Sequence, residues 1–256
     1  MSCPTISIIT VCRNAANTIC HTLESVIAQK RNGLVEYIVI DGGSTDGTQD
    51  IVKSYGCTVD AFVSEPDNGI SDAFNKGIQH SSGGIIGLIN ADDCLSPDTI
   101  NCVCNFFSSN PDVDLLHGDV LLCDGDRIIK QMVPAGRWWY PWRLVLFNHP
   151  ATFVRRNIYE TFGLFDTSLK IAMDVEMFLR WKRASVSIKY LPIPLVVMQV
   201  GGVSGQSAIQ GFDETRRIFL EYGYPWFVVN LLCLSKTVIH TVIASVYRCK
   251  KLLISG

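Results

Sequence analysis

The amino-acid sequence predicts an α/β fold, with a mixed, mostly parallel β-sheet flanked by helices. Short runs rich in β-branched residues alternate with segments whose apolar residues recur every three or four positions. This alternation indicates crossover connections and therefore parallel strands. Polar residues directly follow several of the predicted strands. Because ligands bind beyond the carboxyl ends of the strands in such sheets, we expect a functional site at that edge.

The predicted elements follow one another closely in the first part of the chain. Strands are expected at residues 6–11, 37–40, 61–64 and 85–89. Helices are expected at residues 17–29, 48–55 and 71–79. Further along, residues 151–154 are expected to form a strand, and an amphipathic helix is expected directly after position 174. A chain of 256 residues is long enough to bury a substantial core.

Neither the net charge nor the cysteine spacing indicates nucleic-acid binding, disulfides or zinc. The 22 basic and 24 acidic residues give a net charge of -2, so no basic field favours nucleic acid. The ten cysteines are scattered without a CxxC pair, and residues 1–4 lead into a strand pattern rather than a secretory signal. We therefore expect reduced thiols and a cytoplasmic location.

Two adjacent acids, Asp92 and Asp93, follow the apolar run at residues 85–89. A pair of carboxylates at the end of a buried strand suits a hard divalent cation such as Mg²⁺ or Mn²⁺. The same stretch also suits a helix N-terminus, because residues 92–98 contain several good capping residues. The pair by itself favours neither interpretation.

Asn14, Asp41 and Asp67 also follow predicted strand ends, so several polar side chains should converge on one edge. Asp41 precedes two glycines and could form only a turn. However, neither a GxxxxGK[ST] loop nor a GxGxxG motif follows the first strand. An acid at position 41 can accept hydrogen bonds from a nucleotide base or from ribose hydroxyls. We infer a nucleotide site without a P-loop.

Five sequence segments in fixed order carry a family resemblance. They read ISIITVCRN from residue 6, YIVIDGGSTDGT from 37, SEPDNGI from 64, DAFNKG from 72 and NADD from 90. These segments resemble the successive motifs of family 2 glycosyltransferases, which have the GT-A fold. The resemblance extends over residues 5–205 and is strongest to small bacterial members that build O-antigen and other surface polysaccharides.

The resemblance implies roles for the acids at the sheet edge. Asp41 would contact the nucleotide base and Asp67 would help to close the base pocket, with Asn14 beside them. Asp92 would lie near the ribose and would share the metal site with Asp93, the main ligand of Mn²⁺ or Mg²⁺. The family often has Asp where this chain has Asn90. The metal would act as a Lewis acid on the departing diphosphate.

Asp174 matches the position of the family's catalytic base, which deprotonates the acceptor hydroxyl. The match extends upstream through residues 149–156 and 163–166, but Met173 stands where the family often has Glu. Alternatively, Asp174 could be a helix cap and Glu176 a solvated acid of the first turn. One base, one metal and no enzyme nucleophile imply transfer with inversion at the anomeric carbon.

Three further features each have two interpretations. His149 could bind the acceptor or a phosphate, or be a structural histidine beside the strand at 151–154. Arg155 and Arg156 are expected to cap helices or face solvent, and Arg180 to pair with Glu176 at i,i+4 spacing. The glycine-rich residues 201–206 could fold over the diphosphate or serve as a linker.

The C-terminal residues explain a mean hydropathy of +0.23 and an apolar content of 48%. Residues 226–246 are long enough to resemble a membrane span, but Asn230, Lys236 and His240 interrupt them. A basic polar stripe on an apolar helix suits an interfacial membrane helix. A helix packed on the catalytic domain or on a second subunit is the main alternative, and a transmembrane anchor is less favoured. The aromatic loop at 138–143 could stack on sugars, sit at the headgroup level or form a small core of its own.

These features predict a GT-A domain at residues 1–210, with a nucleotide-binding half at 1–100 and an acceptor half at 101–210. Residues 211–256 would form a helical, membrane-associating segment. The expected activity is hexose transfer from UDP-glucose or UDP-galactose to an undecaprenyl-diphosphate-linked sugar in O-antigen or lipopolysaccharide biosynthesis. It would occur on the cytoplasmic face of the inner membrane. Alternatives are use of a GDP- or dTDP-sugar, a sugar-nucleotide nucleotidyltransferase, and a non-catalytic sugar-binding module.

Overall fold

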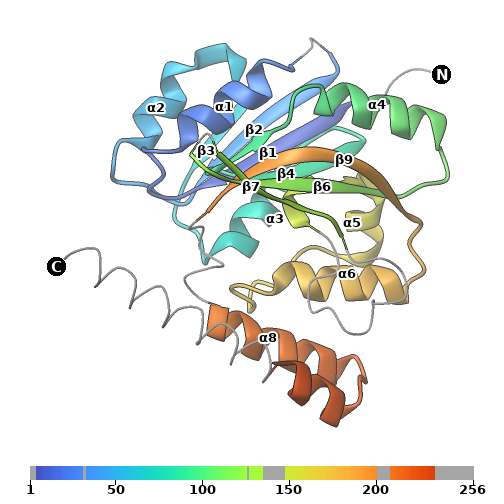
Figure 1. Ribbon diagram of the computed structural model, residues 1–256. Helices are drawn as coiled ribbons and strands as arrows, with labels where there is room; N and C mark the ends of the chain where they lie inside the picture. Colours follow the sequence, from blue (N-terminus) through green and yellow to red (C-terminus); the bar gives the residue numbers. More distant parts are fainter. Residues whose placement is uncertain (1–3, 31–32, 126, 135–147, 201–207, 234–256) are drawn as a thin grey trace.

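The computed structural model describes residues 4–30, 33–125, 127–134, 148–200 and 208–233. Within these residues, one mixed sheet of nine strands runs through the centre of the molecule (Figure 1). The strand order is β3-β2-β1-β4-β8-β6-β9-β5, and β7 pairs with β6 outside this path. The predicted fold class, a mixed α/β sheet flanked by helices, is confirmed.

The first four strands are parallel to one another, as predicted, and β6 and β9 form a further parallel pair. They are β1 (Ile6–Cys12), β2 (Val35–Asp41), β3 (Ala61–Ser64) and β4 (Ile85–Asn90). Between them lie α1 (Ile19–Ile27), α2 (Thr48–Ser54), the short 3-10 helix η1 (Gly56–Thr58) and α3 (Ile70–His80). The predicted strands and helices are all present, with ends that differ by one or two residues.

The remaining elements complete the sheet with mostly antiparallel neighbours. The strands are β5 (Asp93–Leu95), β6 (Leu115–Asp124), β7 (Arg127–Met132), β8 (Thr152–Arg155) and β9 (Ile188–Gln199). The helices are α4 (Thr99–Ser109), the 3-10 helix η3 (His149–Ala151), α5 (Arg156–Phe162), α6 (Met173–Arg183) and α8 (Ala208–Glu221).

Helices cover both faces of the sheet, which explains why β1, β2 and β4 consist mostly of apolar residues. α1 and α2 lie on one face, and α3, α5 and α6 lie on the other (Figure 1). One buried cluster accordingly contains Leu23 of α1 and Val52 of α2. The other contains Phe74 of α3 and Trp181 of α6, together with Phe219 of α8. α8 therefore packs against α6 and extends this second layer.

α3 approaches the sheet most closely at Gly77, which supports a prediction about stability. A Cβ atom on Gly77 would lie 2.3 Å from Cγ2 of Ile9 and 3.3 Å from Cγ1 of Ile40. Gly77→Ala should lower the free energy of unfolding by about 1–3 kcal/mol, because these buried strand side chains cannot retreat. Gly84→Ala is the matched control, since its Cβ would have no neighbour nearer than 3.9 Å. Equal urea midpoints for the two variants would contradict the prediction.

The structure corrects two local expectations and confirms a third. The expected strand at 151–154 begins only at Thr152, because Pro150 lies in the 3-10 turn η3. The amphipathic helix expected after Asp174 begins at Met173, so Asp174 lies inside its first turn. The expected pair between Arg180 and Glu176 is present at 2.9 Å.

Arg155 and Arg156 bind the ends of helices, which is the first of the two roles expected for them, and not solvent exposure. The Arg155 guanidinium donates to the carbonyl oxygens of Phe107 and Asn110 at the end of α4. Arg156 donates to the carbonyl oxygen of Ile78 at the end of α3. Both side chains therefore bind carbonyl groups at the C-terminal ends of helices.

Some expectations fall on residues outside those that the structure describes. These are the aromatic loop at 138–143, the glycine-rich residues 201–206 and the C-terminal residues from 234 onward. Among the described residues, no helix combines the length and the apolar character needed to cross a bilayer. Described cysteines such as Cys12, Cys20 and Cys57 carry free thiols, but Cys104 is disulfide-bonded, which corrects the expectation of reduced thiols at that position.

Candidate active site

Asp41 is the last residue of β2, and its side chain is fully buried. Its Oδ2 atom accepts hydrogen bonds from the backbone N–H of Ser44 at 3.0 Å and from the Ser64 hydroxyl at 2.6 Å. The Ser44 hydroxyl donates to Oδ1. Asp41 therefore does hold the turn that follows it, and it also ties that turn to the end of β3. Two hydroxyls rigidly orient the carboxylate at the carboxyl edge of the sheet.

Asn14 connects the loop after β1 to the loop after β2. Its backbone N–H donates to the Ser44 hydroxyl at 2.7 Å, and its side-chain Oδ1 accepts from the N–H of Thr45 at 2.9 Å. The residue has φ = 51°, a left-handed conformation that Asn adopts more readily than most residues. Asn14 and Asp41 thus share Ser44 as a common partner, and the two loops form one unit.

Asp67 lies directly against the turn that Asp41 holds. A Cβ atom on Gly42 would lie 2.0 Å from Oδ2 of Asp67, so only glycine permits this approach. The other carboxylate oxygen accepts from the N–H of Gly69 at 2.9 Å and lies 4.0 Å from the Arg13 guanidinium. The structure therefore brings Asn14, Asp41 and Asp67 together at one sheet edge.

Asp92 and Asp93 follow the end of β4, but they do not cap a helix. Asp93 is the first residue of the short strand β5, where it pairs with Met198 of β9. The next helix, α4, begins only at Thr99, after Asp98. The helix N-cap interpretation of the acid pair is therefore wrong. β5 instead turns back at the end of β4 and places Asp93 in a buried position with 1% exposure.

The Asp93 carboxyl lies in an environment that a cation would stabilise. Burial raises its pKa to about 7, with the charge of Asp92 adding to this effect and a hydrogen bond from Asn90 opposing it. The Asn90 side chain donates from Nδ2 to Oδ2 of Asp93 at 3.0 Å. The Oδ1 atom of Asn90 is buried and has no hydrogen-bond partner within the described part of the chain.

These oxygens fit a divalent ion that takes some of its ligands from the protein and the others from a substrate. Asp92, Asp93 and the amide oxygen of Asn90 are hard donors. Across the described residues, no three His, Cys, Asp or Glu side chains gather into a metal-binding group. An ion bound here would thus take its remaining ligands from water or phosphate oxygens, as Mg²⁺ usually does.

Asp174 lies in the first turn of α6 and is partly buried. Burial raises its pKa to about 6, while hydrogen bonds from the N–H groups of Val175 and of Asp174 itself oppose the shift. The bond from Val175 measures 2.8 Å. A carboxyl with a pKa near 6 is a stronger base than an ordinary aspartate and is still ionised at neutral pH. Asp174 and Leu88 of β4 line the same small cavity.

Glu214 of α8 positions the segment before Asp174, and no sequence motif indicated it. Its carboxylate accepts hydrogen bonds from the backbone N–H groups of Lys170, Ile171 and Ala172 at 2.9–3.2 Å. Burial alone would raise the pKa of Glu214, but these bonds, together with one from Gln210, lower it. The contact joins residues more than 40 positions apart, so only the tertiary structure reveals it.

A comparison with known families decides the class of this protein. The sequence model described as "Glycosyl transferase family 2" matches residues 7–169, a span that includes Asn14, Asp41, Asp67, Asp92 and Asp93. The chain belongs to glycosyltransferase family 2.

Several known proteins are similar to this transferase in sequence or in fold. It is 34% identical to an uncharacterized glycosyltransferase, Rv1514c, of Mycobacterium tuberculosis, over 88% of this chain and 87% of the relative. Its fold resembles the crystal structure of S. aureus TarS 1–349 in complex with UDP-GlcNAc, with a TM-score of 0.66 and 16% identity over 90% of this chain and 70% of that one. The chain spans 42% of a longer TarS structure.

A second solved structure of similar fold contains both a donor and a metal. The mannosyltransferase PcManGT from Pyrobaculum calidifontis, in complex with GDP-Man and Mn²⁺, has a TM-score of 0.65 and 18% identity. The match covers 98% of this chain and 81% of that chain. Both structures confirm the GT-A fold for this transferase. Membership of the family favours transfer of a sugar over the nucleotidyltransferase and binding-module alternatives.

His149 of the transferase lies inside the second apolar layer. Its ring lies 5.2 Å from the ring of Phe74 and 5.9 Å from that of Phe165, centroid to centroid. Burial lowers its pKa to about 4, so the imidazole is neutral at neutral pH. A neutral imidazole between two phenyl rings does not suit a phosphate ligand. The geometry therefore favours the structural interpretation of His149.

Proposed function

We propose that this family 2 transferase moves a hexose from a nucleotide sugar to a lipid-diphosphate-linked sugar with inversion of configuration. The observation that carries the proposal is the spacing of polar groups along the sheet edge. β1 lies between β2 and β4, with Val11 opposite both Ile40 and Asn90. The Asp41 end and the Asn90 end are therefore two strand spacings apart, or roughly 10 Å. That separation suits a bound nucleoside diphosphate.

Asn14, Asp41 and Asp67 would form the nucleoside end of this site. The Asp41 carboxylate, held by Ser44 and Ser64, would accept hydrogen bonds from the base, and Asp67 would close the pocket over it. Asp92 would contact the ribose, and Asp93, with Asp92, would hold Mn²⁺ or Mg²⁺ against the diphosphate. Bound there, the ion would supply Lewis-acid stabilisation of the leaving group.

Asp174 would be the base that accepts the proton of the acceptor hydroxyl. Leu88 lines the same cavity as Asp174 and lies two residues before Asn90 on β4. Because side chains alternate along a strand, Leu88 and Asn90 face the same side of the sheet. Asp174 therefore lies on the side of the sheet to which Asn90 points. Direct attack by the hydroxyl needs a single base and inverts the anomeric centre.

The donor is proposed to be UDP-glucose or UDP-galactose, with a GDP- or dTDP-sugar as the alternative within the family. The solved neighbours contain UDP-GlcNAc in one case and GDP-Man in the other, so the shared fold is compatible with either nucleotide. We expect UDP to raise the melting temperature most strongly in a panel of UDP, GDP, dTDP and CMP, and only when Mn²⁺ is present. A larger shift with GDP would assign the alternative donor class, and no shift with any nucleotide would contradict the proposed site.

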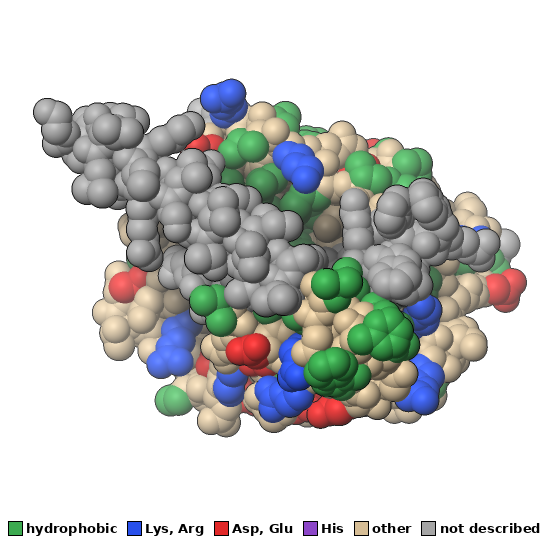
Figure 2. Space-filling model, turned by 60° about the horizontal axis from the view of Figure 1, so that its bottom comes forward, with side chains coloured by type: hydrophobic (Ala, Val, Ile, Leu, Met, Phe, Trp, Pro, Cys, Tyr) green, Lys and Arg blue, Asp and Glu red, His purple; other side chains and the backbone are tan. Residues whose placement is uncertain are grey.

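The acceptor is proposed to be an undecaprenyl-diphosphate-linked sugar on the cytoplasmic face of the inner membrane, in O-antigen or lipopolysaccharide biosynthesis. Residues 226–233 form a helix after α8, and Val229 and Cys233 are buried on one side of it. Trp226, Phe227 and Leu231 are 67–68% exposed on the other side. Figure 2 shows a face on which hydrophobic side chains lie among Lys and Arg side chains, with some Asp and Glu side chains beside them. Such a surface suits the interface of an anionic bilayer.

Removing the exposed apolar side chains of this helix should weaken membrane binding. The triple variant Trp226→Ala, Phe227→Ala, Leu231→Ala should bind phosphatidylglycerol vesicles at least about tenfold less tightly, because apolar area no longer enters the bilayer. Vesicle sedimentation measures the effect. The control is Ile128→Ala with Ile129→Ala, two exposed apolar residues of β7. Equal binding by both variants would contradict the proposal that the 226–233 helix contacts the membrane.

A further inference from the structure

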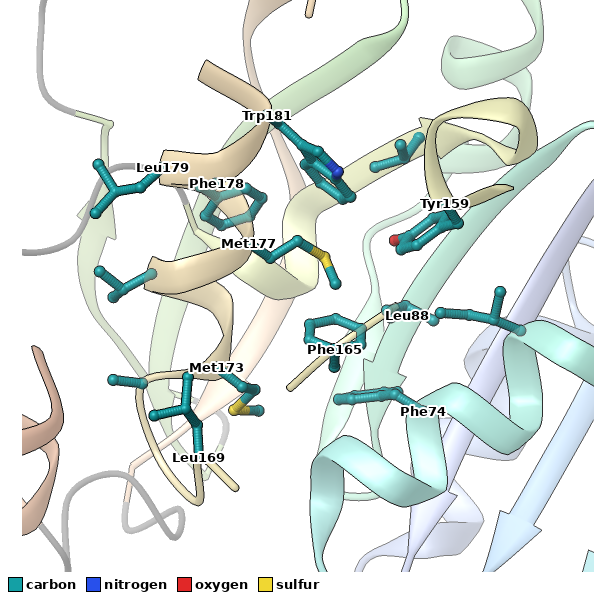
Figure 3. Close-up of a cluster of buried hydrophobic side chains, with 14 of the residues drawn as sticks. Phe74, Leu88, Tyr159, Phe165, Leu169, Met173, Met177, Phe178, Leu179 and Trp181 are labelled. Carbon is teal, nitrogen blue, oxygen red and sulfur yellow. The ribbon is translucent and has the colours of Figure 1, made fainter. Parts of the chain in front are cut away.

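A small cavity lies beside Asp174, between α6, α5 and β8. It encloses about 10 Å³. This is close to the smallest volume that accommodates a buried water molecule. Most of its wall is aromatic and aliphatic, as in the surrounding cluster shown in Figure 3. Its polar lining residues are Asp174, His149, Tyr159, Thr152 and Trp181.

Two of these residues bring buried nitrogen atoms that no group in the described part of the chain satisfies. Nε2 of His149 and Nε1 of Trp181 are both buried and find no hydrogen-bond partner among the described residues. A buried polar atom without a partner costs roughly 1–3 kcal/mol. Figure 3 shows the indole nitrogen of Trp181 and the hydroxyl of Tyr159 turned toward the interior of the cluster. Two unsatisfied atoms on the wall of one cavity indicate a polar occupant.

The chemistry of the lining groups matches a single water molecule. The indole N–H of Trp181 can only donate, and the carboxylate of ionised Asp174 can only accept. The imidazole of His149 is neutral at neutral pH, so its Nε2 accepts when the proton is on Nδ1. One water molecule can accept from Trp181 while it donates to Asp174 and His149. Three partners is the usual number for a buried water.

We propose that this cavity binds one ordered water molecule that joins His149 and Trp181 to Asp174 and so makes both of them positioning residues for the base. The inference rests on the role proposed for Asp174. The water holds the Asp174 carboxylate in one orientation and donates a hydrogen bond to its ionised form. It thereby offsets part of the cost of burying that charge. The arrangement lets an aspartate stay ionised next to an apolar cluster.

The other ionisable groups near Asp174 are neutral or engaged elsewhere. Tyr159 of α5 is neutral because burial raises its pKa. Glu176 and Arg180, on α6, pair with each other at 2.9 Å. Glu214 of α8 binds backbone N–H groups, and Arg155, which ends β8, binds carbonyl oxygens. The described β4 strand contains no ionisable residue. The described β8 strand contains only Arg155, at its end. Loss of the water is therefore the main route by which substitution of a cavity residue can change the pKa and the orientation of the Asp174 carboxyl.

Removing either nitrogen should change the pH dependence of transfer. In Trp181→Phe and in His149→Phe, the acid limb of the kcat profile should move upward by about half a pH unit or more, since the ionised base loses a hydrogen bond. We expect kcat above the acid limb to fall about threefold to tenfold, because the base is no longer held in one orientation, with the KM for donor unchanged. Met177→Leu, which alters an apolar wall residue of the same cavity, should leave the acid limb in place. A purely structural role would lower stability in all three variants without moving the limb.

A high-resolution crystal structure provides the second measurement. It should show one ordered water molecule within hydrogen-bond distance of Asp174, His149 and Trp181, and this water should be absent in Trp181→Phe. Wild-type density without a water in the cavity, or unchanged acid limbs in both variants, would overturn the inference. Full activity of Asp174→Asn would instead refute the assignment of the base. The density map would then still decide whether the water site exists.

Discussion

Asp174→Asn should reduce transfer at least about a thousandfold while leaving donor binding intact. The amide cannot accept the proton of the acceptor hydroxyl, and general base catalysis contributes about 10²–10⁴ in rate. In the wild type, kcat should fall as the pH decreases through about 6, because the Asp174 carboxyl, whose pKa is raised to about 6, is then protonated and cannot act as a base. A radiolabelled-sugar assay measures the rate, and calorimetry measures binding of the donor. Wild-type turnover by the variant would exclude Asp174 as the base.

The same variant should not lose stability, which separates catalysis from folding. The pKa of Asp174 is raised from 3.8 to about 6, so the folded state holds its proton more tightly than the unfolded state. The resulting stabilisation is present below pH 4 and is lost as the pH rises through 6. At pH 8 the neutral amide of the Asp174→Asn variant avoids the burial of a charge. The melting temperature of the variant should therefore equal or exceed that of the wild type. Asp213→Asn, an exposed acid on α8, is the activity control and should remain fully active.

Asp93→Asn should abolish the dependence of donor binding on Mn²⁺ and lower transfer by about a hundredfold or more. The substitution keeps an oxygen that can accept from Asn90, so the hydrogen bond at 3.0 Å can persist. What it removes is the charge that would hold a divalent ion against the diphosphate, which metal-assisted transfer requires. Titration of the nucleotide with and without Mn²⁺ measures the effect.

Asp98→Asn serves as the control for the metal site because it changes an exposed acid close by in the sequence. It should retain the Mn²⁺ response of the wild type. If Asp93→Asn keeps the same response, the ion binds elsewhere or is not needed. Varying Mn²⁺ also separates the two acids in the pH profile. A limb that moves with the Mn²⁺ concentration belongs to Asp93, and one that stays in place belongs to Asp174.

Local patterns predicted most of the first half of the fold. Residues 6–11 and 85–89 are mostly apolar because β1 and β4 are covered on both faces, and such runs show clearly in a sequence. Parallel strands place their carboxyl ends on the same edge, so the convergence of Asn14, Asp41 and Asp67 followed from strand order. The hydrogen bonds through Ser44 could not be predicted, since they depend on loop geometry.

The acid pair shows where local patterns fail. Residues 92–98 have the composition of a helix start, yet Asp93 begins β5. Backbone hydrogen bonds to Met198 of β9, more than a hundred residues away, decide that outcome. A local capping preference of about 1 kcal/mol is easily outweighed by such tertiary contacts.

The sequence by itself determined the α/β class, the order of the motifs and membership of glycosyltransferase family 2, because these depend on residue types at short spacing. Only the tertiary structure decided which polar groups are buried, and what they contact. It placed Glu214 beneath the start of α6, and it brought His149 and Trp181 to a cavity shared with Asp174. Burial raises the pKa of Asp93 and of Asp174, and long-range hydrogen bonds lower the pKa of Glu214; neither effect can be read from the neighbouring residues in the chain.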